Sequence, residues 1–262
     1  MVNKKNVNKK ANRKKVPAAA KVEPRVVEHI GIVRNDPYLE PYEQAIRGRH
    51  DHALWKIDQL TRHGKQTLSD FANGYEYFGL HRTDTGWVFR EWAPHATDIY
   101  LVGDFSSWKE QETYRCRRIE GTDNWQLTLP AGALTHGQLY KMHVKWDGGE
   151  GERIPAWANR VVQDEKTHIF SAQVWAPKAP YRWVSKPLTP QTKPLLIYEC
   201  HIGMAQDEEK VGSYSEFRQQ VLPRIVRDGY NAIQIMAIQE HPYYGSFGYH
   251  VSSFFSPSSR FC

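Results

Sequence analysis

The spacing of apolar residues changes twice along this chain of 262 residues, so no single repeating architecture accounts for it. From Trp87 onward apolar residues alternate with polar ones in short runs, and turn clusters such as Gly103-Asp104 and Asp147 to Gly151 separate the runs. Alternation of this kind, broken by turns every 8 to 12 residues or so, is typical of an antiparallel β-sandwich. We therefore predict an all-β, immunoglobulin-like sandwich over residues 75–175.

Helical spacing precedes this region. Asp36 followed by Pro37 is a start signal for a helix, and apolar residues then recur at roughly helical spacing from Tyr42 to Leu60. The spacing predicts a helical leader over residues 30–74, with one or two helices and a break near Gly48.

The first 22 residues contain eight Lys and Arg and no Asp or Glu, whereas the whole chain has a net charge of +6. The remainder thus carries 27 basic and 29 acidic side chains. The basic character belongs to a tail, and we expect no nucleic-acid partner for the folded part. We interpret residues 1–29 as a disordered basic tail, either a solvated leader or an electrostatic arm for RNA or an anionic surface.

A proline-rich stretch and a new pattern follow the sandwich. Five prolines between residues 176 and 194 predict an extended linker. The order strand, helix, strand after Leu195, with Ser213 and Glu216 as a capping box and Pro223 bending or dividing the helix, is the unit of a parallel α/β domain. We expect the second strand, 232–238, to be buried on both sides because its apolar character hardly alternates.

A closed α/β barrel needs about 200 to 250 residues, and only 68 remain from Leu195 to Cys262. The fold class is therefore multidomain: a helical leader, a sandwich, and over 195–262 the first β/α units of an incomplete (β/α)8 barrel. We expect the chain to be the front part of a longer protein or a natural truncation of one.

Several classes of protein are excluded by what the sequence lacks. No apolar run approaches the roughly 18 residues that span a bilayer, so we expect no membrane association. Three widely spaced cysteines fit a reducing, cytoplasmic location. The Glu199–His201 and Glu240–His241 pairs supply too few ligands for a metal, so we expect strand-end histidines with satisfied hydrogen bonds, no metal and no cofactor.

Tryptophans are the residues most suggestive of a ligand. All nine lie between Trp55 and Trp183, and several sit beside turns, for example Trp92 in EWAP and Trp108 in GDFSSW. The apolar face of a glucose ring stacks on such indoles while neighbouring polar groups bind its hydroxyls. A sandwich also needs buried aromatic residues, so composition alone leaves both interpretations open.

Five segments resemble the 1,4-α-glucan (glycogen) branching enzymes. They are GYEYFGLHR at 74–82, FREWAPHA at 89–96, YLVGDFSSW at 100–108, YECHIGM at 198–204, and MAIQEHPYYGSFGYHVSSFFSPSSRF at 236–261. The resemblance implies a helical leader, a glycogen-binding sandwich of carbohydrate-binding module family 48, and the start of a family-13 glycoside hydrolase barrel.

The resemblance also implies a reaction. Branching enzymes cut an α-1,4 glucan chain and rejoin it through an α-1,6 bond with retention, which requires a carboxylate nucleophile and a carboxylic acid. In the family these acids follow the third barrel strand and would lie beyond Cys262. We therefore expect the function to be glycosyl transfer in glycogen biosynthesis, with no catalytic residue in this chain, which should be inactive alone. The alternative is a non-catalytic glycogen-binding module.

Binding residues follow from the resemblance position by position. Tyr249 matches the tyrosine that lies against the sugar before the cleaved bond. The positions that match the family's non-catalytic glucan surface are Trp92, Ala93, Pro94, Trp108, Asp123, Asn124 and Lys141, with Gly64 and Lys65 beside it in the leader. The implied partner is α-1,4 glucan, as glycogen or amylose, bound by a monomer.

Overall fold

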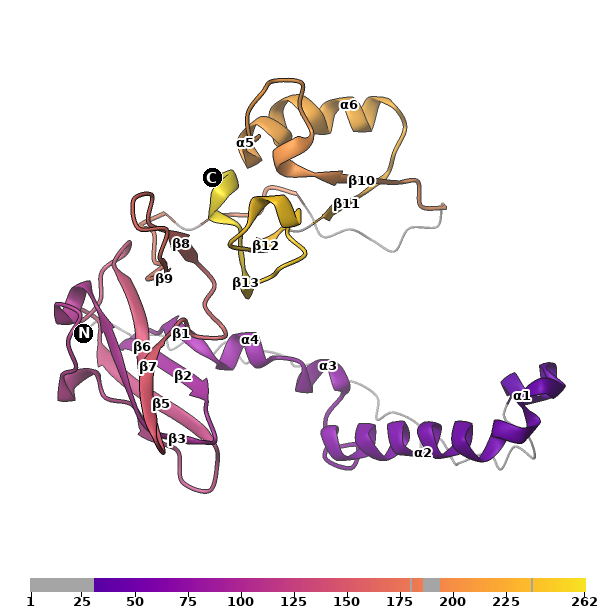
Figure 1. Cartoon of the computed structure of the whole chain (residues 1–262), viewed down its shortest axis with the longest axis horizontal. Helices are drawn as coiled ribbons and strands as arrows, with labels where there is room; N and C mark the ends of the chain where they lie inside the picture. The colour runs from indigo at the N-terminus through magenta and orange to yellow at the C-terminus, as the bar shows by residue number, and fades with distance from the viewer. Residues whose placement is uncertain (1–30, 180, 186–193, 237) are drawn as a thin grey trace, which may run out of the picture. The chain divides into compact units, whose positions relative to one another are not determined.

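A computed structural model describes residues 31–179, 181–185, 194–236 and 238–262 (Figure 1). The predicted basic tail lies outside the described residues, and so does much of the predicted linker. The chain divides into two compact units, Met1–Leu68 and Ser69–Cys262. Among the described residues, no helix is both long enough and apolar enough to cross a membrane.

The first unit is helical where it is described. It contains α1 (Gly31–Asn35), a 3-10 helix (Pro37–Tyr42) and α2 (Glu43–Leu60), and α3 (Leu68–Phe71) spans the boundary. Asp36 caps the 3-10 helix by accepting the Tyr38 backbone N–H at 3.1 Å. The break predicted near Gly48 is wrong, because α2 continues through it. A glycine inside a helix costs only about 1 kcal/mol, which the flanking turns offset.

Two antiparallel sheets form the sandwich of the second unit, which follows α4 (Gly74–Tyr77). One sheet has the order β1 (Gly79–Arg82), β2 (Gly86–Trp92), β5 (Asn124–Pro130) and β4 (Arg117–Arg118). The other has the order β3 (Ala96–Gly103), β6 (Leu139–Trp146), β9 (Phe170–Gln173) and β8 (Val161–Gln163), with β7 (Gly149–Arg153) also paired to β6. Period two in the sequence thus corresponds, on β2 and β5, to strands with one more deeply buried face.

The core lies between these sheets. Side chains two residues apart point inward from each strand: Trp87 and Phe89 on β2, Leu127 and Leu129 on β5, Ile99 and Leu101 on β3, Tyr140 and Met142 on β6. The outward positions of β6 carry Lys141, His143 and Lys145, and β3 contributes Asp98, whereas Tyr100 and Val102 of β3 are buried. The sandwich therefore presents a polar outer face over β6.

A parallel pair, β10 (Ile197–His201) and β11 (Ala232–Met236), follows in residue order. The capping box is confirmed, since Ser213 Oγ accepts the Glu216 N–H and Glu216 accepts the Ser213 N–H. Pro223 divides the helix as predicted, because it falls in the first turn of α6 (Leu222–Arg227), after α5 (Tyr214–Glu216) and a π turn (Phe217–Val221). These elements connect the two strands.

The expectation that the second strand is buried on both sides is wrong. Residues of β11 are exposed or half-buried, with Ile233 exposed, and Ile197 of β10 is exposed as well. The physical reason is that β11 pairs with β10 alone among the described residues. An antiparallel pair that the sequence did not predict, β12 (Gln239–Glu240) with β13 (Ser253–Pro257), completes the unit.

Candidate functional site

Trp108 lies in a tight turn just after β3. Ser107 and Trp108 both adopt left-handed backbone conformations, with φ of 54° and 58°. The Trp108 N–H donates to the Gly103 carbonyl at 2.9 Å, and its indole Nε1–H donates to Asp104 Oδ1 at 3.1 Å. Asp104 Oδ2 accepts the Leu139 N–H at 2.7 Å. The indole is thus fixed to the start of β6 and is still 39% exposed.

Lys141 completes this group, which we call the Trp108 cluster (Asp104, Trp108, Lys141 and Glu152). The Lys141 ammonium lies 5.9 Å from the centroid of the Trp108 ring and 2.7 Å from Glu152 Oε2. A cation at this distance is attracted to the face of an indole. The cluster combines a rigid aromatic face with hydrogen-bond donors and acceptors. These are the groups that bind the face and the hydroxyls of a sugar ring.

Changing Ser107 to glycine should stabilise the sandwich by about 0.5 to 1 kcal/mol. A left-handed conformation costs a non-glycine residue about 1 to 2 kcal/mol, and glycine loses part of this gain through its greater freedom in the unfolded chain. Urea denaturation of the purified chain measures the change. Ser107→Ala is the matched control and should have nearly the same stability as the parent chain. A Ser107→Gly variant that is less stable than the parent would contradict the inference that the Ser107 backbone is strained.

Trp92, Ala93, Pro94, Asp123 and Asn124 form a separate group, the Trp92 cluster. Trp92 at the end of β2 pairs across the strands with Asn124, and the Ala93 N–H donates to the Asp123 carbonyl at 3.0 Å. Arg118 binds both the Asp123 carboxylate and, at 3.2 Å, the Pro94 carbonyl. These residues lie together, with an exposed indole at their edge.

The two clusters lie at opposite ends of β3. Ala93 accepts the Ala96 N–H where β3 begins, whereas Trp108 binds Gly103 where it ends. Eight residues of extended strand separate these ends by about 23 Å. The structure therefore places Trp92 and Trp108 at opposite ends of β3, and Lys141 accompanies only Trp108.

The remaining predicted residues lie elsewhere. Gly64 and Lys65 belong to the first unit, in the turn after α2, where Gly64 has a φ of 78°. Tyr249 follows β11 in the second unit and is 75% exposed. It lines a pocket of about 320 Å³ together with Glu199 and Gln234.

The Glu240–His241 and Glu199–His201 pairs form no metal site among the described residues. Glu240 is buried and accepts hydrogen bonds from the His241 N–H, the Ser258 hydroxyl and the Ser259 N–H. His201 is buried, but its two ring nitrogens have no partner among the described residues, so the expectation of a satisfied histidine is wrong. Burial, with the nearby His241, lowers the pKa of His201.

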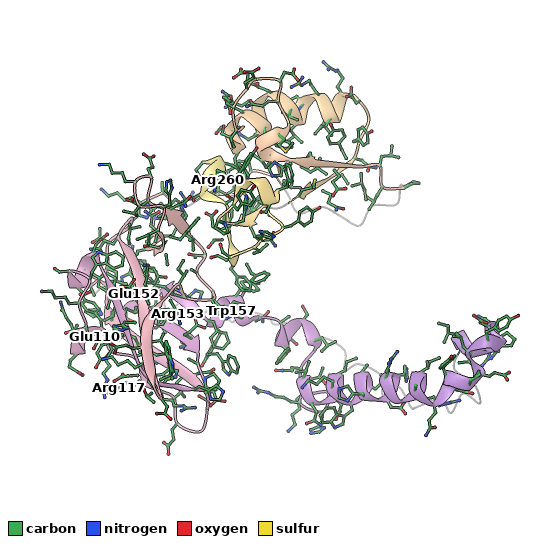
Figure 2. The ribbon with its side chains drawn as sticks, in the orientation of Figure 1. Glu110, Arg117, Glu152, Arg153, Trp157 and Arg260 are labelled. Carbon is green, nitrogen blue, oxygen red and sulfur yellow. The ribbon has the colours of Figure 1, made fainter. Side chains whose placement is uncertain are left out.

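A cluster of charged side chains on the outer face of β6 was not predicted from the sequence. Glu110, His143 and Glu150 bring ligand atoms within 4.8 Å of one another, and Figure 2 labels Glu110 on the sandwich. The Lys145 ammonium, however, lies 2.7 Å from Glu110 and 3.9 Å from Glu150, and the hydrogen bond to Glu110 raises its pKa. Because an ammonium already lies between these carboxylates, we interpret the group as an ion-pair network. The alternation Lys141, His143, Lys145 was the signal available in the sequence.

Comparison with known families defines the class of this fold. Residues 77–158 match the family model described as carbohydrate-binding module 48 (isoamylase N-terminal domain). The range covers the sandwich from the end of α4 to the loop before β8 and includes both tryptophan clusters. Over residues 77–158 the sandwich is therefore similar to the carbohydrate-binding modules of family 48.

Proteins that align with most of the chain indicate a more specific family. The chain is 39% identical over 237 residues to the 1,4-alpha-glucan-branching enzyme of Dictyostelium discoideum, an alignment that covers 88% of the chain and 34% of that protein. It is 40% identical over 244 residues to the enzyme of the same name from Yarrowia lipolytica, with 88% and 34% covered. For the 1,4-alpha-glucan-branching enzyme 2-2, chloroplastic/amyloplastic, of Arabidopsis thaliana the identity is 39%, with 91% and 31% covered. The resemblance to the branching-enzyme family is confirmed, and the chain corresponds to an N-terminal portion that spans about a third of these relatives.

Solved structures agree at the level of the fold. A pullulanase from Bacillus acidopullulyticus superposes with a TM-score of 0.56 at 15% identity, over 70% of the chain and 25% of that protein. A type I pullulanase from Bacillus subtilis gives 0.55 at 18% identity, over 72% and 30%. At such identities the likeness shows the fold alone.

Proposed function

We propose that this chain is part of a 1,4-α-glucan-branching enzyme and that its sandwich holds α-1,4 glucan, as glycogen or amylose, at the Trp108 cluster. The observation that carries the proposal is the exposed Trp108 indole, which Asp104 fixes and which Lys141 flanks. A strained turn is retained where the surrounding structure determines it, and such strain concentrates at functional positions. The fixed indole would bind a sugar ring without losing side-chain entropy.

The Trp92 cluster is the second glucan contact in this proposal. It offers an exposed indole beside the Asn124 amide and the Asp123 carboxylate. Because it lies at the far end of β3, it would hold a different part of a long glucan chain. We assign it the weaker role, since the Trp92 indole nitrogen has no hydrogen-bond partner among the described residues.

Residues 195–262 are proposed as the first β/α units of a (β/α)8 barrel. The parallel register of β10 and β11 supports this, as do the exposed apolar residues Ile197 and Ile233, which further strands and helices would cover. Barrel enzymes bind substrate at the carboxyl ends of their strands. Tyr249 follows the carboxyl end of β11, which supports its proposed contact with the sugar next to the cleaved bond.

Bond cleavage itself is proposed to require carboxylic acids that are not among these 262 residues. In a retaining transfer one carboxylate attacks the anomeric carbon while an acid protonates the leaving oxygen. The share of this chain would be to bind and orient glucan for that step. Glycogen synthesis in the cytoplasm by a monomer is the proposed setting, although one relative is named chloroplastic/amyloplastic.

Changing Trp108 to alanine should abolish retention of the chain in an amylopectin affinity gel. The side chain is partly exposed, so its loss removes the stacking face with little effect on the core. The melting temperature should therefore stay close to that of the parent. Trp92→Ala, which removes an exposed indole from the other end of β3, is the matched control and should reduce retention less.

Two outcomes would contradict this assignment. A Trp108→Ala chain that melts early would mean that the indole is structural, as the sandwich core alone would require. A chain that keeps both its stability and its retention would move the glucan site elsewhere on the sandwich.

A further inference from the structure

A pocket of about 550 Å³ lies on the side of the second unit where α4, β1, the loop before β8 and β13 meet. Its lining comprises Tyr75, Glu76, Leu80, His81, Trp157, Asn159 and Phe255. None of these belongs to the Trp108 or Trp92 cluster. The volume falls in the range of about 300 to 1,000 Å³ that is usual for small-ligand sites.

Two of three stacked aromatic rings, Trp157 and Phe255, line this pocket. Trp157 stacks on Phe78 and on Phe255, with ring centroids 5.4 Å and 4.1 Å apart and planes inclined by 22° and 17°. Figure 2 labels Trp157. Phe255 lines the pocket and is 43% exposed. The stack therefore ends in an uncovered aromatic surface on which a further flat, apolar face can lie.

Two glycines hold the indole in this position. A Cβ atom at Gly74 would approach Trp157 Cη2 to 2.6 Å, and one at Gly79, where φ is +90°, would approach the Trp157 carbonyl oxygen to 2.7 Å. Any side chain at Gly74 would displace the indole from the stack. The close approach at both positions fixes the place of Trp157, which lines the pocket.

The polar groups of the pocket select the chemical class of its ligand. Glu76 supplies a carboxylate, Asn159 an amide and His81 an imidazole whose Nε2 lies 2.7 Å from the Phe78 carbonyl oxygen. The hydrogen bond with the Glu76 carboxylate raises the pKa of Tyr75. The described lining contains no lysine or arginine, so a phosphate group would lack a counter-charge there, whereas sugar hydroxyls would find acceptors and donors.

We propose that this pocket is a second α-glucan site, separate from the Trp108 cluster, that binds one or two glucose rings of a neutral oligosaccharide against Phe255. The sugar face extends the aromatic stack, and Glu76 accepts hydrogen bonds from its hydroxyls. The proposal rests on glucan being the ligand of this chain but not on the Trp108 cluster. Phe255 of β13 thereby joins the module in binding glucan.

Maltotriose titrations of the full chain test the proposal through the indole N–H signals in ¹H–¹⁵N NMR spectra, with the Trp157 signal assigned by Trp157→Phe. Maltotriose at millimolar concentrations should shift the Trp157 signal in the parent and in Trp108→Ala alike. Phe255→Leu should weaken that response about tenfold, and Glu76→Gln, which leaves the core untouched, about fivefold. Phe254→Leu, the neighbouring exposed phenylalanine outside the pocket lining, is the control and should not weaken it.

Each other result would overturn the inference. A Trp108 signal that shifts while Trp157 does not would retain the proposed function and refute the second site, and no shift of either signal would refute both. Equal affinity at Trp157 in Phe255→Leu and Glu76→Gln would also refute it. So would a Trp157 shift with adenosine monophosphate but not with maltotriose, because the ligand would then be a nucleotide.

Discussion

Changing Glu240 to alanine is expected to destabilise the C-terminal segment by at least about 3 kcal/mol. The buried carboxylate accepts hydrogen bonds from the His241 N–H at 3.1 Å, the Ser258 hydroxyl at 3.0 Å and the Ser259 N–H at 2.7 Å. A hydrogen bond to a charged group contributes about 1.5 to 3 kcal/mol, and each buried donor left without an acceptor adds a penalty. Hydrogen exchange of the backbone amides in 239–261 should accelerate about 100-fold or more.

The exposed Glu209 offers a matched control, since Glu209→Ala removes the same carboxylate without uncovering a buried donor. The amides of β2 and β5 should keep their protection in both variants, because the sandwich has its own core. Unchanged exchange in 239–261 of the Glu240→Ala chain would show that water replaces the carboxylate at little cost.

Changing Phe89 to alanine should destabilise the sandwich by about 3 to 5 kcal/mol. Phe89 is completely buried between the two sheets, and its removal leaves a cavity that the packed strands cannot fill. Denaturant unfolding followed by tryptophan fluorescence measures the change, because Trp87 and Trp125 lie in the same core. Glucan retention should fall together with stability.

Val88 is the matched control for this experiment. It is the next residue on β2, is only half-buried and faces the opposite side of the sheet, so Val88→Ala should cost much less. A Phe89→Ala chain as stable as Val88→Ala would mean that the sheets close over the cavity, and the tight packing described for this core would be wrong.

The sandwich was predictable because alternation specifies which face of each strand is buried. The capping box at Ser213 was predictable for a similar reason, since its partner lies only three residues away. The pairing of β12 with β13 was not, because Pro242 and the glycines between these strands obscure any period, and the pair is held by contacts such as that of Ser252 with Glu240. The burial of β11 depends on which other strands and helices pack against it, and the spacing of apolar residues within β11 cannot specify those elements.

For the tryptophan clusters, too, part of the structure could be predicted from the sequence and part could not. Trp92 precedes and Trp108 follows the strand expected around Ile99 to Val102, so their separation was implicit in the order of the residues. The left-handed turn at Ser107 and the bond from the indole to Asp104 were not, since a turn of this kind usually contains glycine. The pocket around Trp157 could not be predicted, because Tyr75 and Phe255 are 180 positions apart in the sequence.

The stacking of Phe255 on Trp157 bears on where a shorter recombinant protein can be ended. The Ser256 hydroxyl also donates to the Ala158 carbonyl, so β13 covers the loop that carries the indole. A module cut after residue 175 would keep every strand of the sandwich yet leave one face of Trp157 bare. Contiguous aromatic surface of that kind promotes self-association. Poor solubility of the isolated module would then result from the loss of Phe255 over the Trp157 ring and would not mean that the module fails to fold.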